Sequence, residues 1–293
     1  MIIPDWAIFG LLASFLAALQ PLTQEKYKAE PFALAMAIKV VMVLVTLPFV
    51  ITQGLPTAPV FYLAICFTAV IWCISDVYYY RAVQVVGAGP VSRILPATAI
   101  LTFVAWFFFD PALLDRYFAA PWVGAAITGC ILMATFFATC LTRCMVSRQA
   151  VRLLWFVMLA SAMDPIATKL ILHSAGAAKQ APFAYVFVEA VLMLVLWSGY
   201  GAVKKPVALS AFVSPTVIKA GLMIGALNAT RLILQNFAYM DVENPTYLRV
   251  MMFTDALWII LIYKLVGRRE EANVKAGLGI VAAAAGLVLL KSL

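Results

Sequence analysis

Charged residues are scarce in this sequence. Only 12% of its 293 residues are Asp, Glu, Lys or Arg, whereas 65% are hydrophobic. A soluble domain carries about 25% charged and about 45–50% apolar residues. Because so little polar surface is present, a water-soluble body of this length is excluded. The composition predicts a protein that lies in a lipid bilayer.

Potential metal ligands and reactive groups are also few. The sequence has one histidine and five cysteines, and no two of these cysteines form a Cys-x-x-Cys pair. Cysteines in apolar segments are usually buried small hydrophobic side chains. Metal-ligand clusters, nucleophile–base spacings and Gly-rich nucleotide loops ending in Lys-Ser or Lys-Thr are missing too. We therefore expect no metal, no cofactor, no ATP hydrolysis and no catalytic residue.

Long apolar runs are what the sequence has in abundance. A helix needs about 20 predominantly apolar residues to cross the hydrocarbon core, and ten stretches meet this requirement. They are residues 5–22, 31–51, 59–84, 90–109, 121–142, 150–172, 182–201, 214–238, 245–265 and 274–291. We predict an all-α polytopic membrane protein of ten transmembrane helices joined by short connections.

Lys and Arg are unevenly divided among these connections. The basic residues gather in the first, fifth, seventh and ninth connections, at Lys26, Lys28, Arg143, Arg148, Arg152, Lys204, Lys205, Lys264, Arg268, Arg269 and Lys275. Short basic loops remain in the cytoplasm, so we expect an inner-membrane protein with both termini on the non-cytoplasmic side. The same loops account for the net charge of +8, and we expect no nucleic-acid partner.

The two halves of the chain share weak internal similarity. The matched pairs, in the same order in both halves, are Pro31-Phe32-Ala33 with Pro182-Phe183-Ala184, Gln20-Pro21 with Asp164-Pro165, and Gly89-Pro90 with Asn244-Pro245. We predict two five-helix repeats, residues 1–145 and 146–293. An odd number of crossings inverts the second repeat, and inverted repeats place a binding site near the midplane between the two copies. Alternating access then follows from rocking of one half against the other.

Several ionisable or polar residues fall inside the predicted helices. Charges at bilayer depth cost a few kcal/mol, about 2.5–3.5 on insertion scales, and those that occur usually face a cavity or a partner. Asn228, Arg231 and Gln235 share one helical face, as do Asp76 and Tyr80. Pro165 frees a main-chain carbonyl beside Asp164. The predicted substrate-binding set is Lys39, Asp76, Tyr80, Arg93, Asp164, Glu189, Asn228, Arg231, Gln235 and Arg249.

Three roles remain open for these residues. Asp76 with Arg231, and Lys39 with Glu189, could form ion pairs that fix how the halves dock. Arg81, Arg93 and Lys169 could reach along the helix to the membrane interface. Alternatively, basic groups hold a carboxylate or phosphate while acids hold an amine, or a proton that drives transport. Because the basic set outnumbers the acidic one and Arg suits bidentate anion binding, an anionic or zwitterionic substrate is favoured.

An aromatic run offers a competing ligand class. Tyr78, Tyr79 and Tyr80, with Trp72 and Trp258, could cage an organic cation. Packing in the core and at the lipid interface is the simpler interpretation of such a run, and the sequence does not decide between the two.

Several short segments form a recognisable pattern: Gly267-Arg268-Arg269-Glu270, the following Gly277-Leu278-Gly279-Ile280 and Ala285-Gly286-Leu287, and Tyr80-Arg81-Ala82 ahead of Pro96. Together with the ten predicted helices, this pattern resembles the drug/metabolite transporter superfamily in its ten-helix, EamA-like form. Asp110-Pro111 departs from the Gly-Glu loop of that family in the first copy. The resemblance implies a secondary carrier or exporter and leaves the substrate open.

These observations lead to one favoured function and two alternatives. The favoured function is a secondary transporter that moves a small polar or amphipathic metabolite by alternating access, with protons as a candidate coupling ion. The first alternative is a flippase or exporter of a lipid-linked intermediate. The second is an intramembrane lipid-modifying enzyme, which the scattered single acids disfavour. The expected partners are a small-molecule substrate and the lipid bilayer, and the chain is a monomer or a homodimer through the small residues of its last helix.

Overall fold

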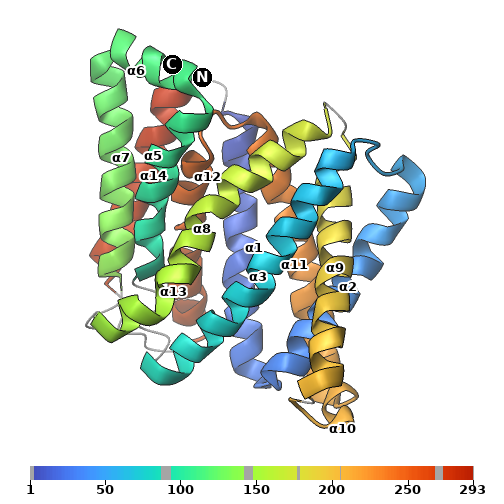
Figure 1. Ribbon diagram of the computed structural model, residues 1–293. Helices are drawn as coiled ribbons and strands as arrows, with labels where there is room; N and C mark the ends of the chain where they lie inside the picture. The colour runs from blue at the N-terminus through green and yellow to red at the C-terminus, as the bar shows by residue number, and fades with distance from the viewer. Residues whose placement is uncertain are drawn as a thin grey trace.

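The computed structural model describes residues 3–86, 94–141, 148–176, 179–204, 206–267 and 273–292. These residues form helices and short connections, with no strand among them. The helices run back and forth between the two ends of an elongated bundle, and both termini lie at the same end (Figure 1).

The helices begin and end close to the predicted limits. They are α1 (Asp5–Tyr27), α2 (Pro31–Gln53), α3 (Pro59–Val86), the 3-10 turn η1 (Leu95–Ala97), α5 (Thr98–Phe109), α6 (Pro111–Ala119), α7 (Pro121–Cys140), α8 (Arg148–Ser174), α9 (Ala181–Lys204), α10 (Leu209–Phe212), α11 (Pro215–Asp241), α12 (Pro245–Met252), α13 (Asp255–Leu265) and α14 (Val274–Ser292). The short helices α6 and α10 were not predicted.

Local sequence accounts for the positions of several helix starts. Proline stands at the first position of α2, α6, α7, α11 and α12, where its missing N–H costs nothing. The Glu30 carboxylate before α2 accepts hydrogen bonds from the N–H groups of Phe32 and Ala33. Ser214 and Asn244 cap α11 and α12 in the same manner. These side chains satisfy donors that a helix start leaves unpaired.

The helices make this an integral membrane protein. Seven of them are long and apolar enough to cross a bilayer: the relevant parts of α1, α2, α7, α8, α9, α11 and α14. An eighth crossing results if α5 with its preceding turn and α6 count as one span, although the two parts are bent by 101°.

Two further predicted spans are not among these. In α3 the part whose side chains are described without a break, Pro59–Ser75, is apolar, and the predicted ninth span is divided at Phe253–Thr254 into α12 and α13.

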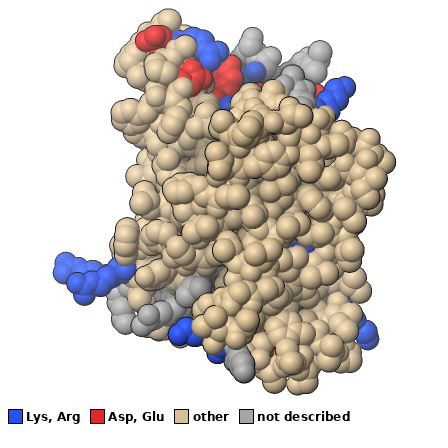
Figure 2. Space-filling view, turned by 45° about the vertical axis from the view of Figure 1, so that its right-hand side comes forward, with Lys and Arg blue, Asp and Glu red and all other residues tan. Residues whose placement is uncertain are grey.

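The surface has the charge distribution of a bilayer protein. In the view of Figure 2, charged atoms gather at the two ends, and the broad belt between them is almost entirely uncharged. Large apolar side chains such as Phe67, Leu44 and Phe136 are well exposed. They would be costly in water but are suited to lipid tails.

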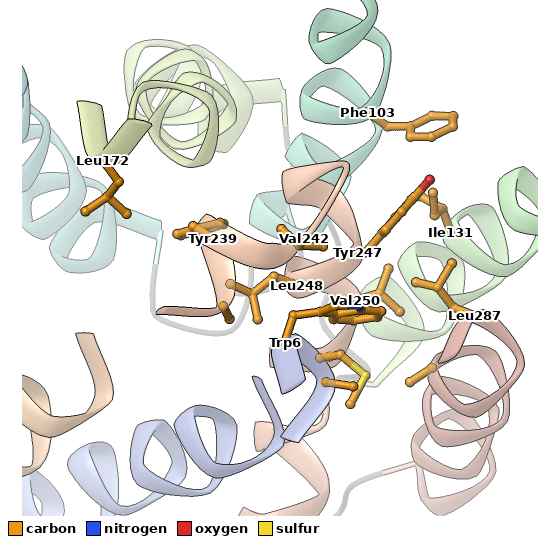
Figure 3. Packing of buried hydrophobic residues seen from close by; sticks show 14 of the residues in the cluster. Trp6, Phe103, Ile131, Leu172, Tyr239, Val242, Tyr247, Leu248, Val250 and Leu287 are labelled. Atoms are coloured by element: carbon orange, nitrogen blue, oxygen red, sulfur yellow. The ribbon is translucent and has the colours of Figure 1, made fainter. Parts of the chain in front are cut away.

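The helix contacts follow a regular scheme. Helix α1 packs on α11, and α3 packs on α8, while α2 contacts α9 and α7 contacts α14. The short helix α12 lies inside the bundle and contacts α1, α5, α7 and α14. Its Tyr247 extends between Phe103 of α5 and Ile131 of α7, and Trp6 and Leu287 lie close by (Figure 3).

Glycines allow two helix pairs, α2 with α11 and α7 with α14, to approach closely. A Cβ atom at Gly225 of α11 would lie 2.6 Å from the Cβ of Val41 in α2, and one at Gly279 of α14 would collide with the Phe137 ring of α7. Close packing of this kind is the main source of helix association in a membrane, where no hydrophobic drive acts between helices.

Candidate functional site

A cavity of about 530 Å³ lies among the helices. It is lined by residues of α2, α3, α8, α9, α11, α12 and α13 and of the turns η1 and Phe253: Lys39, Trp72, Leu95, Asp164, Thr168, Tyr185, Glu189, Met193, Asn228, Arg231, Leu232, Gln235, Asn236, Tyr239, Arg249, Met252, Phe253 and Asp255. The volume falls in the range of about 300–1,000 Å³ of small-molecule sites.

The polar face of α11 forms one wall of this cavity. The Arg231 guanidinium donates to the Asn228 side-chain oxygen, at 3.2 Å from Nε and 2.9 Å from Nη2. It also donates to Gln235 Oε1 at 3.1 Å, and Gln235 Nε2 donates to the Tyr239 hydroxyl at 3.1 Å. This chain of bonds runs along one helix face, as the i, i+3, i+7 spacing requires. Among the described side chains, the hydrogen-bond partners of Arg231 are neutral amides.

Helix α8 contributes an exposed carbonyl and a carboxylate. Pro165 has no N–H, so the carbonyl of Ser161, four residues earlier, lacks its helical donor. Arg249 of α12 supplies the missing bond from Nη2. Arg249 Nη1 also donates to Thr98 Oγ1 at 2.5 Å. Arg249 therefore ties α12 to α8 and α5, and the carbonyl that the sequence predicted to be free is used by an arginine.

Asp164 lies on the cavity side of α8. Its carboxylate accepts a hydrogen bond of 2.8 Å from Trp72 Nε1 of α3. One turn further, the hydroxyls of Thr168 and Tyr185 are 3.3 Å apart. An indole donor orients the Asp164 carboxylate without neutralising its charge.

The structure brings most of the predicted substrate-binding residues together. Seven of the ten line this one cavity: Lys39, Asp164, Glu189, Asn228, Arg231, Gln235 and Arg249. Asp76 and Tyr80 belong to α3, but their side chains lie outside the described part, and Arg93 lies outside the described residues. Substrate binding by these residues stays a prediction.

Some lining residues were not in the predicted set. Tyr185 and Met193 lie four residues to either side of Glu189 on α9, so helical spacing from that acid could have found them. Asp255 is the first residue of α13. It enters the cavity because the helix is interrupted just before it, and the continuous apolar pattern around it gives no sign of that break.

Lys169 does not take the interfacial role that the sequence left open for it. Its side chain is buried, with only 6% of the residue exposed. Its Nζ donates to the carbonyls of Tyr239 at 3.1 Å and Val242 at 2.5 Å. Free carbonyls at a helix C-terminus attract a cation, so this lysine caps α11 from within the bundle.

A second polar cluster lies at the end that holds both termini. Glu243, in the connection between α11 and α12, forms ion pairs with Arg116 of α6, at 3.0 Å, and with Lys291 of α14. Burial raises the pKa of the Glu243 carboxyl, but Lys291 and Arg116 outweigh this effect and hold the pKa below its ordinary value. Beside them, the hydroxyls of Tyr117 and Tyr247 share a hydrogen bond.

Neither comparison with known proteins identifies a relative. No protein-family model matches the chain, and no curated protein matches it. Among the described residues, no group of three or more His, Cys, Asp or Glu side chains could hold a metal ion.

Proposed function

We propose that this protein is a secondary transporter that moves a small polar or amphipathic metabolite, with an anionic or zwitterionic group, by alternating access. The observation that carries the proposal is the cavity. Charged and amide side chains from six helices converge there, inside a bundle whose face in Figure 2 is almost free of charge between its two ends. Charges at bilayer depth are costly and mark pathways for polar solutes.

The helix contacts support an inverted-repeat arrangement. When the helices of residues 1–145 are matched in order with those of residues 146–293, α1 corresponds to α8 and α3 corresponds to α11. The observed contact between α1 and α11 is then the counterpart of the observed contact between α8 and α3. The contacts of α1 with α12 and α13 correspond to that of α8 with α5. The helices in the contacts α2–α9, α5–α12 and α7–α14 are each other's counterparts in the two halves. A two-fold axis in the membrane plane would produce this scheme.

The ion-pair cluster supports a rocking movement. Arg116 belongs to the first half, whereas Glu243 and Lys291 belong to the second. Their contacts join the two halves at the end that holds the termini, and alternating access requires such contacts to break when that end opens. The distribution of Lys and Arg among the connections favours the non-cytoplasmic side of the inner membrane for this end.

The proposed family is the EamA-like drug/metabolite transporters. The agreement between the predicted and observed helix limits supports a ten-helix arrangement, in which α12 and α13 form one interrupted span and η1 with α5 another. Interrupted helices beside the cavity suit a transporter, because non-helical main chain at membrane depth occurs where it faces protein or a polar cavity.

Uptake into proteoliposomes tests the proposal. Purified protein is reconstituted, and uptake of labelled amino acids, sugar phosphates and amines is measured with and without a pH gradient. We expect saturable uptake of at least one solute, which Arg231→Gln reduces. Chemical alteration of added lipids without movement of any solute would overturn the proposal in favour of an intramembrane enzyme. Movement of lipid-linked substrates alone would indicate a flippase.

A further inference from the structure

A second cavity, of about 790 Å³, lies between α2, α9 and the short helix α10. Figure 1 shows α10 beyond the last turn of α9, at the end of the bundle opposite both termini. We call this cavity the α10 groove. Its described lining carries one hydroxyl and is otherwise apolar: Phe32 and Met36 of α2, Ser198, Gly201 and Ala202 of α9, residues 206–209, and Phe212 of α10. It shares no described lining residue with the central cavity.

The depth of the α10 groove in the membrane follows from two spans. Its residues belong to the first two turns of α2 and the last two turns of α9, and both helices are long and apolar enough to cross a bilayer. The 24 residues of α9 extend about 36 Å at 1.5 Å per residue, somewhat more than the hydrocarbon core of about 30 Å. The groove therefore lies where hydrocarbon gives way to lipid headgroups.

Aromatic side chains beside the groove agree with this depth. The centroid of the Phe32 ring lies 5.3 Å from that of Trp197, 6.1 Å from that of Tyr200 and 6.2 Å from that of Phe212. Trp and Tyr are enriched at the boundary between hydrocarbon and water. At the rim, Leu209 is 86% exposed, and exposed apolar side chains with polar neighbours are typical of contact with a membrane or a partner.

The α10 groove is open at the surface of the bundle. Ser198 and Ala202 are exposed, and Gly201 contributes no side chain to the space. A Cβ atom at Gly201 would already lie 3.4 Å from Phe32 Cζ. Water gains few hydrogen bonds from apolar walls, so hydrocarbon is the favoured filling. The acyl chain of a neighbouring lipid supplies it.

Lysines flank this apolar space. Lys204 is the last residue of α9 and lies one turn beyond Gly201 on the same face, and Lys28 precedes Phe32 by four residues. Both lysines are exposed, and neither forms an ion pair with a described side chain. The carboxylate of the nearby Glu30 accepts hydrogen bonds from the N–H groups that begin α2. An apolar groove beside free cations is complementary to an acyl chain with an anionic headgroup.

We propose that the α10 groove binds an anionic phospholipid of the surrounding membrane. One acyl chain lies between α2, α9 and α10, and the headgroup phosphate pairs with Lys204, assisted by Lys28. The distribution of Lys and Arg favours the cytoplasmic side for this end, and the cytoplasmic leaflet carries anionic lipids. The site does not depend on the proposed transport function, because its described residues are not those of the central cavity.

Photo-crosslinking tests the occupant. The full-length protein is reconstituted in phosphatidylcholine vesicles that contain a trace of phosphatidylglycerol with a diazirine in one acyl chain, and labelled peptides are identified by mass spectrometry. We expect labelling concentrated in residues 32–36 and 198–212. A phosphatidylcholine probe with the same diazirine chain should label these segments about fivefold less, the ratio that corresponds to about 1 kcal/mol for one lysine. Equal labelling by the two probes would overturn the anionic ligand, and labelling spread evenly over the outer surface would overturn the groove.

Filling the groove tests its geometry. Gly201→Leu places a side chain in the space and should lower labelling of these segments about fivefold or more. Gly199→Leu on the same helix is the matched control, because Gly199 is not a lining residue and a Cβ there meets nothing within 4 Å. Ala202→Phe obstructs the groove from an exposed position and replaces Gly201→Leu if that variant has a lowered thermal midpoint. Undiminished labelling in an obstructed variant that keeps the wild-type midpoint would overturn the site.

Lys204→Gln tests the headgroup contact. This variant should lose most of the preference for the phosphatidylglycerol probe, while labelling by the phosphatidylcholine probe stays at the wild-type level. Lys275→Gln is the matched control, since Lys275 is an exposed lysine at the start of α14, which is not part of the groove. A preference that is unchanged in Lys204→Gln, or lost equally in Lys275→Gln, would overturn the assignment of the phosphate to Lys204.

Discussion

Arg249 of α12 donates a hydrogen bond to the main-chain carbonyl of Ser161 in α8. That carbonyl is available because Pro165, four residues later, has no N–H to offer it. A proline in one helix and an arginine in another are therefore parts of a single interhelical contact, which also includes Thr98 of α5.

This relationship predicts coupling between the two positions. Arg249→Met leaves the Ser161 carbonyl without a donor and should destabilise the protein by about 1.5–3 kcal/mol. Pro165→Ala supplies an N–H at residue 165 that can bond to Ser161 within α8. The double variant should therefore be less destabilised than the sum of the two single variants, in thermal unfolding of the detergent-solubilised protein. Additive losses would contradict a shared carbonyl.

Close packing between α2 and α11 predicts a size limit at Gly225. Gly225→Ala would place a Cβ atom 2.6 Å from Val41 Cβ and 3.0 Å from the Ile38 carbonyl oxygen, so α2 must move. We expect a loss of about 1–3 kcal/mol. Gly129→Ala in α7 is the matched control, because a Cβ there meets nothing within 4 Å and alanine favours the helix. Equal thermal midpoints of the two variants would refute the close approach.

The buried Lys169 predicts a stability loss when its charge is removed. Lys169→Met retains most of the side-chain volume but leaves the carbonyls of Tyr239 and Val242 without this donor. Each unsatisfied buried acceptor costs about 1–3 kcal/mol. Lys179→Met at an exposed position serves as the control. A midpoint for Lys169→Met equal to that of Lys179→Met would show that the lysine does not cap α11.

The ion pairs of Glu243 predict a pH dependence of stability. The pKa of this carboxyl lies below its ordinary value of 4.5. Its contribution is therefore fully present above pH 4.5 and is lost as the pH falls through the lower pKa of the folded protein. The pairs are partly exposed and screened, so we expect about 1 kcal/mol. The difference in thermal midpoint between the wild type and Glu243→Gln should shrink as the pH falls from 6 to 3. A difference independent of pH would contradict the pairing.

The sidedness of the connections can be measured with single cysteines. In a background without the natural cysteines, Lys179→Cys lies between α8 and α9, and Lys204→Cys lies at the far end of α9. A membrane-impermeant maleimide applied to intact cells should label the first and not the second, because the basic loops are expected in the cytoplasm. Reversed labelling would invert the orientation. Labelling of both would exclude α9 as a crossing.

Helix limits could be read from the sequence because they depend on local chemistry. Apolar length, prolines at first positions and caps such as Glu30 and Asn244 act within a few residues. The short helix α6 escaped prediction although its start is local: Pro111 is its first residue, and the Asp110 carboxylate accepts a hydrogen bond from the Leu113 N–H. The bend of 101° from the preceding helix was not predicted either.

The candidate site was predictable in part. Arg231 with Asn228 and Gln235 follows from helical spacing on α11. The separate roles of Arg231 and Arg249 do not, because the partners of Arg249 lie 88 and 151 residues away in the chain. Lys169 shows the same limit. From the sequence, a lysine near a helix end is expected to extend to the membrane interface. Only the packing of α8 against α11 shows that carbonyls of α11 lie beside this lysine.

Residence in the membrane was determined by composition alone, because too few charges are available to solvate the chain in water. The sequence also determined which polar residues must be kept away from lipid, because each of them stands within an otherwise apolar helix. Tertiary structure decided which of them meet. Hydrogen bonds and electrostatic interactions between helices depend on distances of a few ångströms, and the order of residues along the chain does not fix those distances.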